Sequence, residues 1–311
     1  MTHETEHTIE LAAPAEAVYG LIADVSRWPW IFPPTVHAER IEGDDAEEVI
    51  RLWAGAGDDV KSWTSRRRLD PAALRVSFRQ EKSAPPVASM GGEWLLEPLP
   101  GDRTRVRLLH DFTAVDEAST GWLEDVVDRN SAAELAALRR VAELGPELEE
   151  VMLTFDDVTE AAGSAADAYE FIDRADRWPE RLPHVVKVDF REDEDGVQTL
   201  GMETKAKDGS THTTRSFRVG FPNERIVYKQ LVLPALLSVH TGTWLFEPSP
   251  DGARVAITSR HTVAIKRSAV KDVLGEDATV QDARRYVRNA LGANSRATLR
   301  LAGEYAEGKA R

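Results

Sequence analysis

Apolar and polar residues alternate along two long, separated stretches of the chain. In the first stretch the alternation covers residues 47–53, 61–69, 74–80, 92–97 and 103–114, and Gly, Asp and Pro residues interrupt it. Alternation with period two is typical of strands that bury one face. Each stretch therefore predicts a meander of antiparallel strands.

The spacing of apolar residues becomes helical after each meander. Residues 122–143 and 281–307 are rich in Ala, Leu and Arg, and both segments are long enough to cross a whole sheet. Before each meander, a short strand (8–12 and 152–158) leads into two short helices. This order predicts an α+β architecture of the helix-grip type, in which a curved antiparallel sheet wraps around a long C-terminal helix and encloses a pocket.

The two stretches are copies of one unit. Trp28-Pro29 recurs as Trp178-Pro179 at an offset of 150, and Asn130-Ser131 recurs as Asn294-Ser295 at an offset of 164. The change of offset fits one insertion in the second copy, at residues 265–280. A period this long indicates a duplicated domain and not a solenoid. Gly145-Pro146 ends a helix at the junction, so we expect domains at 1–147 and 148–311.

Strand parity predicts which polar side chains face each pocket. On residues 61–69, Trp63, Ser65 and Arg67 share one face and Arg66 and Arg68 share the other. In the second copy, Thr213 and Arg215 share a face with apolar Phe217 and Val219, so we pair them with Ser65 and Arg67. A buried guanidinium is costly unless an acid or a ligand oxygen answers it. Either a salt bridge or a bound substrate would do so.

The same parity brings further polar and aromatic residues to the two pockets. Phe78, Gln80 and His110 would face the first pocket, and Tyr228, Gln230 and His261 the second. The glutamines suit hydrogen bonds to a carbonyl. Each histidine is a candidate proton-transfer group, although a satisfied core histidine is the simpler interpretation.

Tryptophans gather on the elements that enclose this kind of pocket. Flat apolar walls with a polar edge suit a planar ligand, and ordinary core packing is the alternative. The candidates for pocket lining are Trp28, Trp53, Trp63 and Trp94 in the first copy, and Trp178 and Trp244 in the second.

Composition excludes several classes of function. Asp and Glu (53) outnumber Lys and Arg (39), which disfavours nucleic acid as a partner, and the absence of cysteine excludes disulfides and thiolate chemistry. The polar first residues and the lack of a long apolar run predict a cytoplasmic protein without a membrane partner. The His3 to His7 segment matches H-E-x-x-H but lies in a polar tail, so we expect no metal site. No nucleotide-binding loop is present, and we expect no cofactor.

These motifs resemble a known family. The tandem copies, the two Trp-Pro pairs, the W-x-S-x-R strand at Trp63 to Arg67 and Trp94 before Glu97-Pro98 are similar to the di-domain aromatase/cyclases of bacterial type II polyketide synthases, within the START-like superfamily. The resemblance spans nearly the whole chain. It implies aldol closure of the first ring, between C7 and C12 of a ketoreduced poly-β-ketone, followed by dehydration to an aromatic ring.

The resemblance also implies roles and partners. Arg67 would polarise a carbonyl or enolate, Ser65 would position it, and Trp28, Trp63 and Trp94 would shape the chain. The substrate would arrive on the phosphopantetheine of an acyl carrier protein, with other synthase subunits possible. We expect docking at basic clusters, either Arg66/Arg68 or Arg284/Arg285/Arg288. The rival functions are a non-catalytic lipid carrier with the same fold and a chaperone of the synthase complex.

Overall fold

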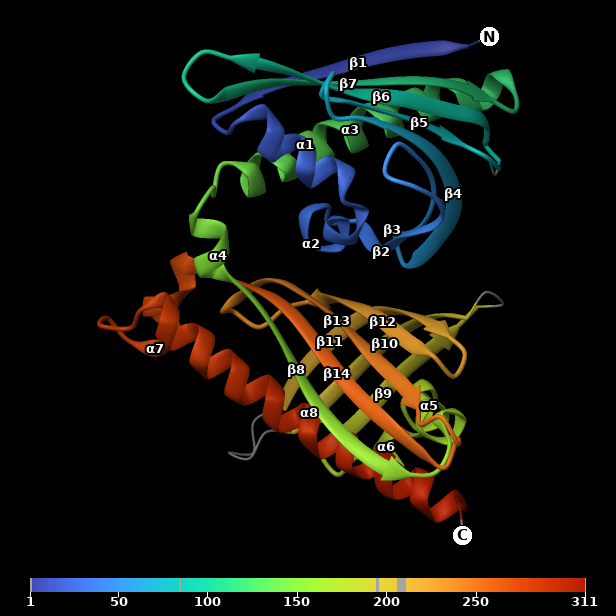
Figure 1. Cartoon of the computed structure of the whole chain (residues 1–311), viewed down its shortest axis with the longest axis vertical. Coiled ribbons are helices and arrows are strands. Elements are labelled where there is room, and N and C mark those ends of the chain that lie inside the picture. Colours follow the sequence, from blue (N-terminus) through green and yellow to red (C-terminus); the bar gives the residue numbers. More distant parts are fainter. Residues whose placement is uncertain (1, 84, 194–195, 206–210, 311) are drawn as a thin grey trace. The chain divides into compact units, whose positions relative to one another are not determined.

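The computed structural model describes residues 2–83, 85–193, 196–205 and 211–310. The chain divides into two compact units, Met1–Leu148 and Glu149–Arg311, and the division falls one residue after the expected junction. Each unit is a seven-stranded antiparallel sheet with helices on one face (Figure 1). The two tandem helix-grip domains predicted from the pattern are therefore confirmed.

In the first unit, the first and last strands in sequence lie side by side in the sheet. The sheet order is β1-β7-β6-β5-β4-β3-β2, so the opening strand pairs with the last strand of the meander. Helix α3 lies across the inner face of the curved sheet (Figure 1). The elements are β1 (His3–Leu11), α1 (Ala15–Ala23), α2 (Trp28–Ile31), β2 (Thr35–Gly43), β3 (Glu47–Ala56), β4 (Asp59–Asp70), β5 (Arg75–Gln80), β6 (Val87–Leu99), β7 (Arg103–Ala114), α3 (Thr120–Ala142) and α4 (Glu147–Val151).

Burial of one helical stripe holds α3 against the sheet. The buried positions of α3 recur every three or four residues, as expected for a helix that covers a sheet with one face. They are Leu123, Val127, Ser131, Leu135, Leu138 and Ala142, and Ala137 beside them is buried as well. Ser131 is the polar exception, and its hydroxyl donates to the carbonyl oxygen of Val127 at 2.7 Å. The stripe thus places one hydroxyl inside the domain at no loss of hydrogen bonding.

The second unit repeats this plan, with sheet order β8-β14-β13-β12-β11-β10-β9. Its long helix α8 carries the corresponding stripe, with Ser295 at the position of Ser131. The elements are β8 (Met152–Ala162), α5 (Ala165–Asp173), α6 (Trp178–Arg181), β9 (Val185–Glu192), β10 (Val197–Lys205), β11 (Thr211–Phe221), β12 (Arg225–Val232), β13 (Leu237–Pro248), β14 (Arg254–Ile265), α7 (Val270–Leu274) and α8 (Val280–Ala310).

Two local expectations were wrong. The segment His3 to His7 is not a tail but half of β1, where His3 and His7 pair with Glu124 (2.7 Å) and Asp128 (3.1 Å) of α3. The edge strands β2 and β9 were missed, because an edge strand exposes much of its length and lacks a clear apolar alternation.

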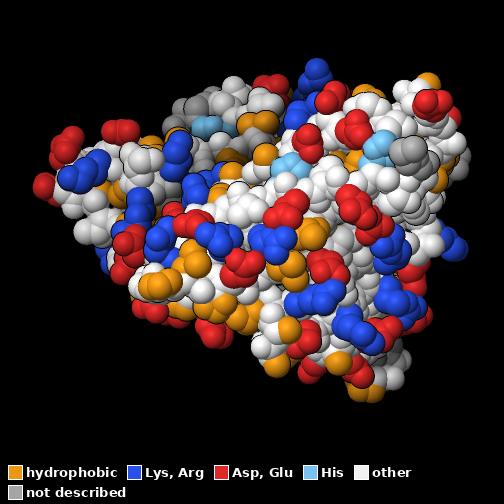
Figure 2. Space-filling view, turned by 90° about the horizontal axis from the view of Figure 1, so that it is seen from above, with side chains coloured by type: hydrophobic (Ala, Val, Ile, Leu, Met, Phe, Trp, Pro, Cys, Tyr) orange, Lys and Arg blue, Asp and Glu red, His pale blue; other side chains and the backbone are white. Residues whose placement is uncertain are grey.

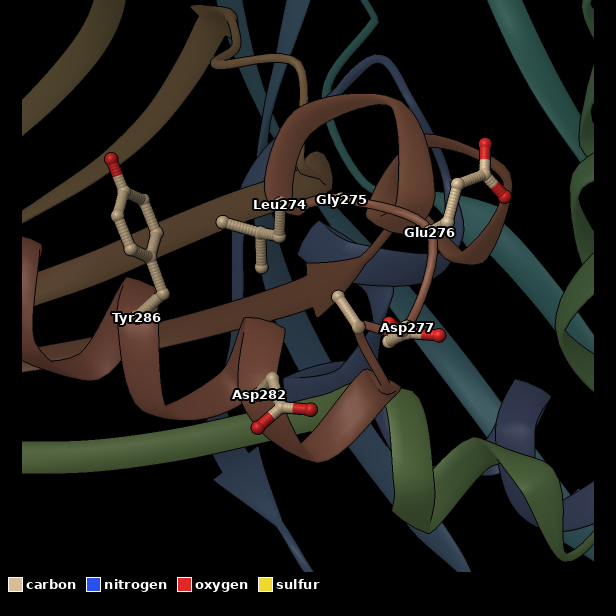
Figure 3. A pocket seen from close by; sticks show the side chains of 7 residues that line it. Leu274, Gly275, Glu276, Asp277, Asp282 and Tyr286 are labelled. Atoms are coloured by element: carbon tan, nitrogen blue, oxygen red, sulfur yellow. The ribbon is translucent and has the colours of Figure 1, made fainter.

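The extra residues of the second copy form α7 and the turn before α8. A hollow of about 470 Å³ lies there, and Figure 3 shows Tyr286 and Asp282 of α8 beside the 274–277 turn. Asp282 and Thr279 cap α8 reciprocally, since each backbone N–H donates to the other side chain. The insertion therefore starts the longer helix.

Candidate active site

Part of the inner face in the first unit is incompletely buried. At one end, the inward residues of β5, β6 and β7 are tightly packed in the core: Val76, Trp94, Leu96, Val106 and Leu108. Further along, on β4 to β7, several inward residues are only half-buried: Trp63, Phe78, Gln80, Met90 and His110. Beyond His110, Phe112 of β7 is fully buried against Leu123 and Val127 of α3. A less tightly packed polar and aromatic region therefore lies between the sheet and α3.

His110 projects from β7 into this region. Its ring lies edge-on to Phe78, with centroids 5.5 Å apart, and its Nδ1 lies 3.4 Å from Oγ of Ser131. Because the Ser131 proton points to the Val127 carbonyl, Ser131 accepts from Nδ1–H, which leaves the lone pair on Nε2. Burial lowers the pKa of His110 to about 4. The imidazole is therefore neutral near pH 7, and Nε2 has no protein partner among the described residues.

Sequence reasoning missed Glu134. It lies one turn after Ser131 on the same face of α3 and is half-buried, and the described part of the chain gives it no cation or hydrogen-bond donor. Burial raises the pKa of its carboxyl group to about 7. The repeat held a signal for it: the offset of 164 that matches Ser131 with Ser295 matches Glu134 with Thr298.

Ser65 and Arg67 face inward, as parity predicted, and both are buried. Arg67 is 1% exposed, and its guanidinium group interacts with other groups of the protein. Its Nη2 donates to the carbonyl oxygens of Ile22 (2.9 Å) and Ala23 (3.2 Å), and its Nη1 lies 3.1 Å from Oε1 of Glu48. The salt bridge that we kept as an alternative is therefore present.

The pairing of Thr213 and Arg215 with Ser65 and Arg67 was wrong. Ser65 lies opposite Gln80, and the residue opposite Gln230 is Ser216, so the S-x-R motif recurs as Ser216 and Arg218. Thr213 is exposed and Arg215 is half-buried.

The error arose from apolar Phe217 and Val219, which we took as the inward face of β11. Arg218 lies between them in sequence and donates to Ile172 of α5, so it points to the inside. Successive residues of a strand point to opposite faces, so Phe217 and Val219 lie on the outer face. An apolar outer face made parity misleading here.

In the second unit, the inward histidine is enclosed by other polar side chains. Nε2 of His261 lies 2.6 Å from Oγ of Ser295, and its Nδ1 lies 2.9 Å from both the Tyr228 hydroxyl and Nε2 of His240. Burial lowers the pKa of His261 to about 4 and that of His240 to about 3. Gly242 makes room for this arrangement, since a Cβ there would lie 2.3 Å from the Tyr228 oxygen. Both His261 nitrogens are therefore occupied by protein groups.

The six tryptophans proposed to line the pockets do not share one environment. Trp28 and Trp63 are half-buried on the inner side of the first unit, whereas Trp94 is 4% exposed and packs in the core. The expectation that Trp53 lines the pocket was wrong. Glu48, Ile50 and Leu52 of β3 pair with inward residues of β4, so Trp53 points to the outer face, where it contacts Arg51 and His37.

In the second unit, Trp178 and Trp244 both belong to the main core cluster. The two predicted glutamines lie on the inner faces. The amide nitrogen of Gln80 lies 3.8 Å from the Met90 sulfur, and Oε1 of Gln230 is buried without a hydrogen-bond partner in the part of the chain that the structure describes.

The basic clusters differ in what they contact. Arg284 donates to backbone carbonyls of residues 149, 150 and 152, Arg285 pairs with Asp282, and Arg288 pairs with Asp157. These three arginines therefore stabilise α8.

On the outer face of the first sheet, Arg66 and Arg68 border a hollow of about 340 Å³. Arg66 pairs with Glu81 at 2.8 Å, while the described residues give Arg68 no ion pair. Figure 2 shows acidic and basic side chains interspersed over the face in view. The hollow itself is of mixed charge, because Glu47, Glu93 and Asp111 line it together with Arg66, Arg68 and Arg79.

Both halves of the chain match models of one kind. The models are described as polyketide cyclase / dehydrase and lipid transport, and they match residues 2–143 and 162–281. A bifunctional cyclase/dehydratase of the actinorhodin polyketide synthase, from Streptomyces coelicolor, is 51% identical over 96% of both chains. The chain belongs to the polyketide cyclase/dehydratase family. It is an enzyme of that class, with both domains of its bifunctional members.

Other relatives agree over the full length. A granaticin synthase cyclase/dehydratase from Streptomyces violaceoruber is 47% identical over 98% of this chain and 94% of its own. Among solved structures, the di-domain aromatase/cyclase of the BE-7585A pathway is 50% identical, covers 98% of this chain and 99% of its own, and has a TM-score of 0.91. The di-domain enzyme of the steffimycin pathway is 38% identical over the same shares, with a TM-score of 0.89. Within the described residues, no helix is both long and apolar enough to cross a membrane.

Proposed function

We propose that this cyclase/dehydratase closes and aromatises the first ring, between C7 and C12, of a ketoreduced poly-β-ketone held on an acyl carrier protein. We further propose that the reaction takes place in the first unit. The observation that carries this second step is the pair His110 and Glu134: a neutral base on the inner face of the sheet, and a carboxyl group with a pKa of about 7 on the buried side of α3, both incompletely buried.

These two groups suit both halves of the reaction. In the aldol step, Nε2 of His110 takes a proton from the carbon between two carbonyls, and Glu134 protonates the alkoxide that forms when this carbon attacks the distant carbonyl. In the dehydration, His110 takes the next carbon proton, the electron pair forms the C=C bond, and the hydroxyl leaves as water with the Glu134 proton. Return of the proton from imidazolium to carboxylate after each step restores the neutral base and the acid, so no reagent is consumed.

The half-buried aromatic residues suit a positioning role. Phe78 lies beside His110, and Trp63 lies on the neighbouring strand β4; both present flat apolar surfaces. A long ketide that folds against such walls has fewer conformers, and this favours one ring closure over others. Gln80, with its amide group toward the same space, suits a hydrogen bond to a ketide carbonyl.

Three exchanges between the copies support assigning the reaction to the first unit. Phe78, Met90 and Glu134 correspond to Tyr228, His240 and Thr298 in the second unit, where the first two exchanges supply hydrogen-bond partners to His261 and the third removes the acid. The second unit is then structural, because protein groups occupy both nitrogens of His261, the histidine that corresponds to His110.

A matched pair of variants tests the assignment. His110→Gln and His261→Gln change equivalent positions, and each is assayed with a minimal synthase and ketoreductase by identifying the products. We expect His110→Gln to lower aromatic product by at least about 100-fold in favour of spontaneously cyclised compounds. His261→Gln should retain the product and lose only stability. Equal losses, or loss only on His261→Gln, would place the reaction elsewhere.

A further inference from the structure

The buried arginine of each unit reaches the same part of the fold. Arg67 is on β4, and its Nη2 donates to Ile22 and Ala23 at the C-terminal end of α1. Its guanidinium also lies over the ring of Trp28, with the central carbon 5.1 Å from the centroid. The Trp28 indole N–H in turn donates to the Ile22 carbonyl at 3.1 Å. Arginine, indole and helix end thus form one closed set of contacts.

The second unit repeats this set although its interior chemistry differs. Nη2 of Arg218 donates to Ile172 of α5 at 2.7 Å, and its guanidinium lies 5.1 Å from the Trp178 centroid. The Trp178 indole donates to Phe171 at 3.3 Å. The group opposite the arginine on the next strand changes from Glu48 to Gln198. The contacts to helix end and indole are therefore common to both copies, and the ion pair is not.

Simple physical chemistry explains these contacts. The last carbonyls of a helix lack partners within the helix and carry partial negative charge, so a cation with several N–H groups is well suited to bind them. Arg67 and Arg218 are 1% and 2% exposed, which leaves almost no guanidinium surface for a substrate. In the first unit, Trp28 is the first of three neighbouring aromatic residues. The Phe32 ring lies edge-on to Trp28 with centroids 5.5 Å apart, and the Trp94 centroid lies 6.3 Å from that of Phe32.

We propose that Arg67 is a positioning residue, which fixes Trp28 and the end of α1 and does not touch the substrate. Its effect on ring closure is transmitted through the Trp28 ring. This differs from the carbonyl-polarising role that the family resemblance implies. It rests on the proposed function in one respect, namely that ring closure takes place in the first unit.

Two substitutions separate the roles of charge and hydrogen bonding. Arg67→Met removes both, whereas Arg67→citrulline, a neutral side chain of the same length, removes the charge but keeps a terminal N–H that reaches the Ile22 carbonyl. We expect Arg67→Met to lower correctly cyclised product about 100-fold and Arg67→citrulline to be about tenfold better. If citrulline and Met are equally defective with equal thermal stability, the charge itself acts on the substrate and the proposal fails.

A double-mutant cycle with Trp28→Phe tests the route of the effect. If Arg67 acts through Trp28, Arg67→Gln adds less than twofold to the loss caused by Trp28→Phe, whereas independent contacts with substrate would multiply the two losses. Fluorotryptophan NMR gives a readout that does not need turnover, because Arg67→Gln should shift the Trp28 resonance and leave Trp178 unchanged. Arg218→Gln is the matched control and should shift Trp178 without changing the products.

The outcomes also separate this proposal from the proposed function. A Trp28 shift with multiplicative losses contradicts the positioning role alone. Full activity of the His110→Gln enzyme contradicts the assignment of the reaction to the first unit, whatever the Trp28 resonance does.

Discussion

Replacement of Glu134 by Gln should stabilise the protein at neutral pH while it removes activity. The amide keeps the size of the side chain and resembles the protonated acid, but it has no proton to give. Burial holds the pKa of Glu134 at about 7, against an ordinary value of 4.5. At roughly 1.4 kcal/mol per pH unit, this difference corresponds to about 3 kcal/mol. The side chain keeps some exposure, so we expect on the order of 1–3 kcal/mol.

The direction follows from proton linkage. Below pH 4.5 the carboxyl is protonated in both folded and unfolded chains and has no pH-dependent effect on stability. As pH rises from 4.5 to 7, the unfolded chain loses this proton and the folded chain keeps it, so the wild type becomes less stable. The stability gained by Glu134→Gln should therefore be small at pH 5, grow up to pH 7 and stay constant above pH 8.

Urea titrations of both proteins at pH 5 and pH 8 measure the gain, with Asp125→Asn as an exposed carboxylate control on the same helix. Product analysis in the reconstituted synthase measures activity. The wild-type rate should also fall as pH rises through about 7, because the acid form of Glu134 is lost. A gain of equal size at both pH values, or normal product from the Glu134→Gln enzyme, would refute the reasoning.

Two further predictions follow from burial and charge. Trp94→Ala should lower the free energy of unfolding by about 3–5 kcal/mol, because Trp94 is in the core. Trp63→Ala, at a half-buried position, should lower the free energy of unfolding by less than half as much but change the product mixture more. Denaturant titrations and product analysis test both variants, and equal losses of stability would contradict the distinction. Arg68→Glu should weaken binding of the acidic carrier protein more at low salt than at high salt, with Arg285→Glu as control; titrations without a salt-dependent change would place docking elsewhere.

The architecture was predictable because the pattern repeats. Offsets that match Trp28 with Trp178 and Ser131 with Ser295 identify a duplicated unit, and strand parity placed Ser65 and Arg67 correctly. What sequence could not give was the register of β11. The predicted alignment of the two copies was three residues out at this strand. It placed the S-x-R motif at Thr213 and Arg215, whereas the structure places it at Ser216 and Arg218.

The candidate site was harder to predict because its acid, Glu134, has no equivalent in the second copy. Parity and motifs find residues that recur, and Glu134 does not recur. Its chemistry comes from burial on the inner face of α3, which depends on how the helix lies on the sheet. The prediction for Trp53 was wrong for a related reason. An aromatic residue that follows an apolar neighbour on a strand can lie on either face of the sheet.

Comparison of the two copies shows which features belong to the scaffold and which to the chemistry. Both copies keep a serine in the helix stripe, an inward histidine, and an arginine that binds the end of the first helix. A buried imidazole is stable when both nitrogens have partners. The second copy supplies both from its own side chains, whereas the first leaves Nε2 of His110 without one among the described residues. That open nitrogen lies in the same interior, between the sheet and α3, as the half-buried carboxyl group of Glu134, which burial keeps partly protonated near pH 7. The first copy thus keeps a reactive pair where the second forms a closed network around His261.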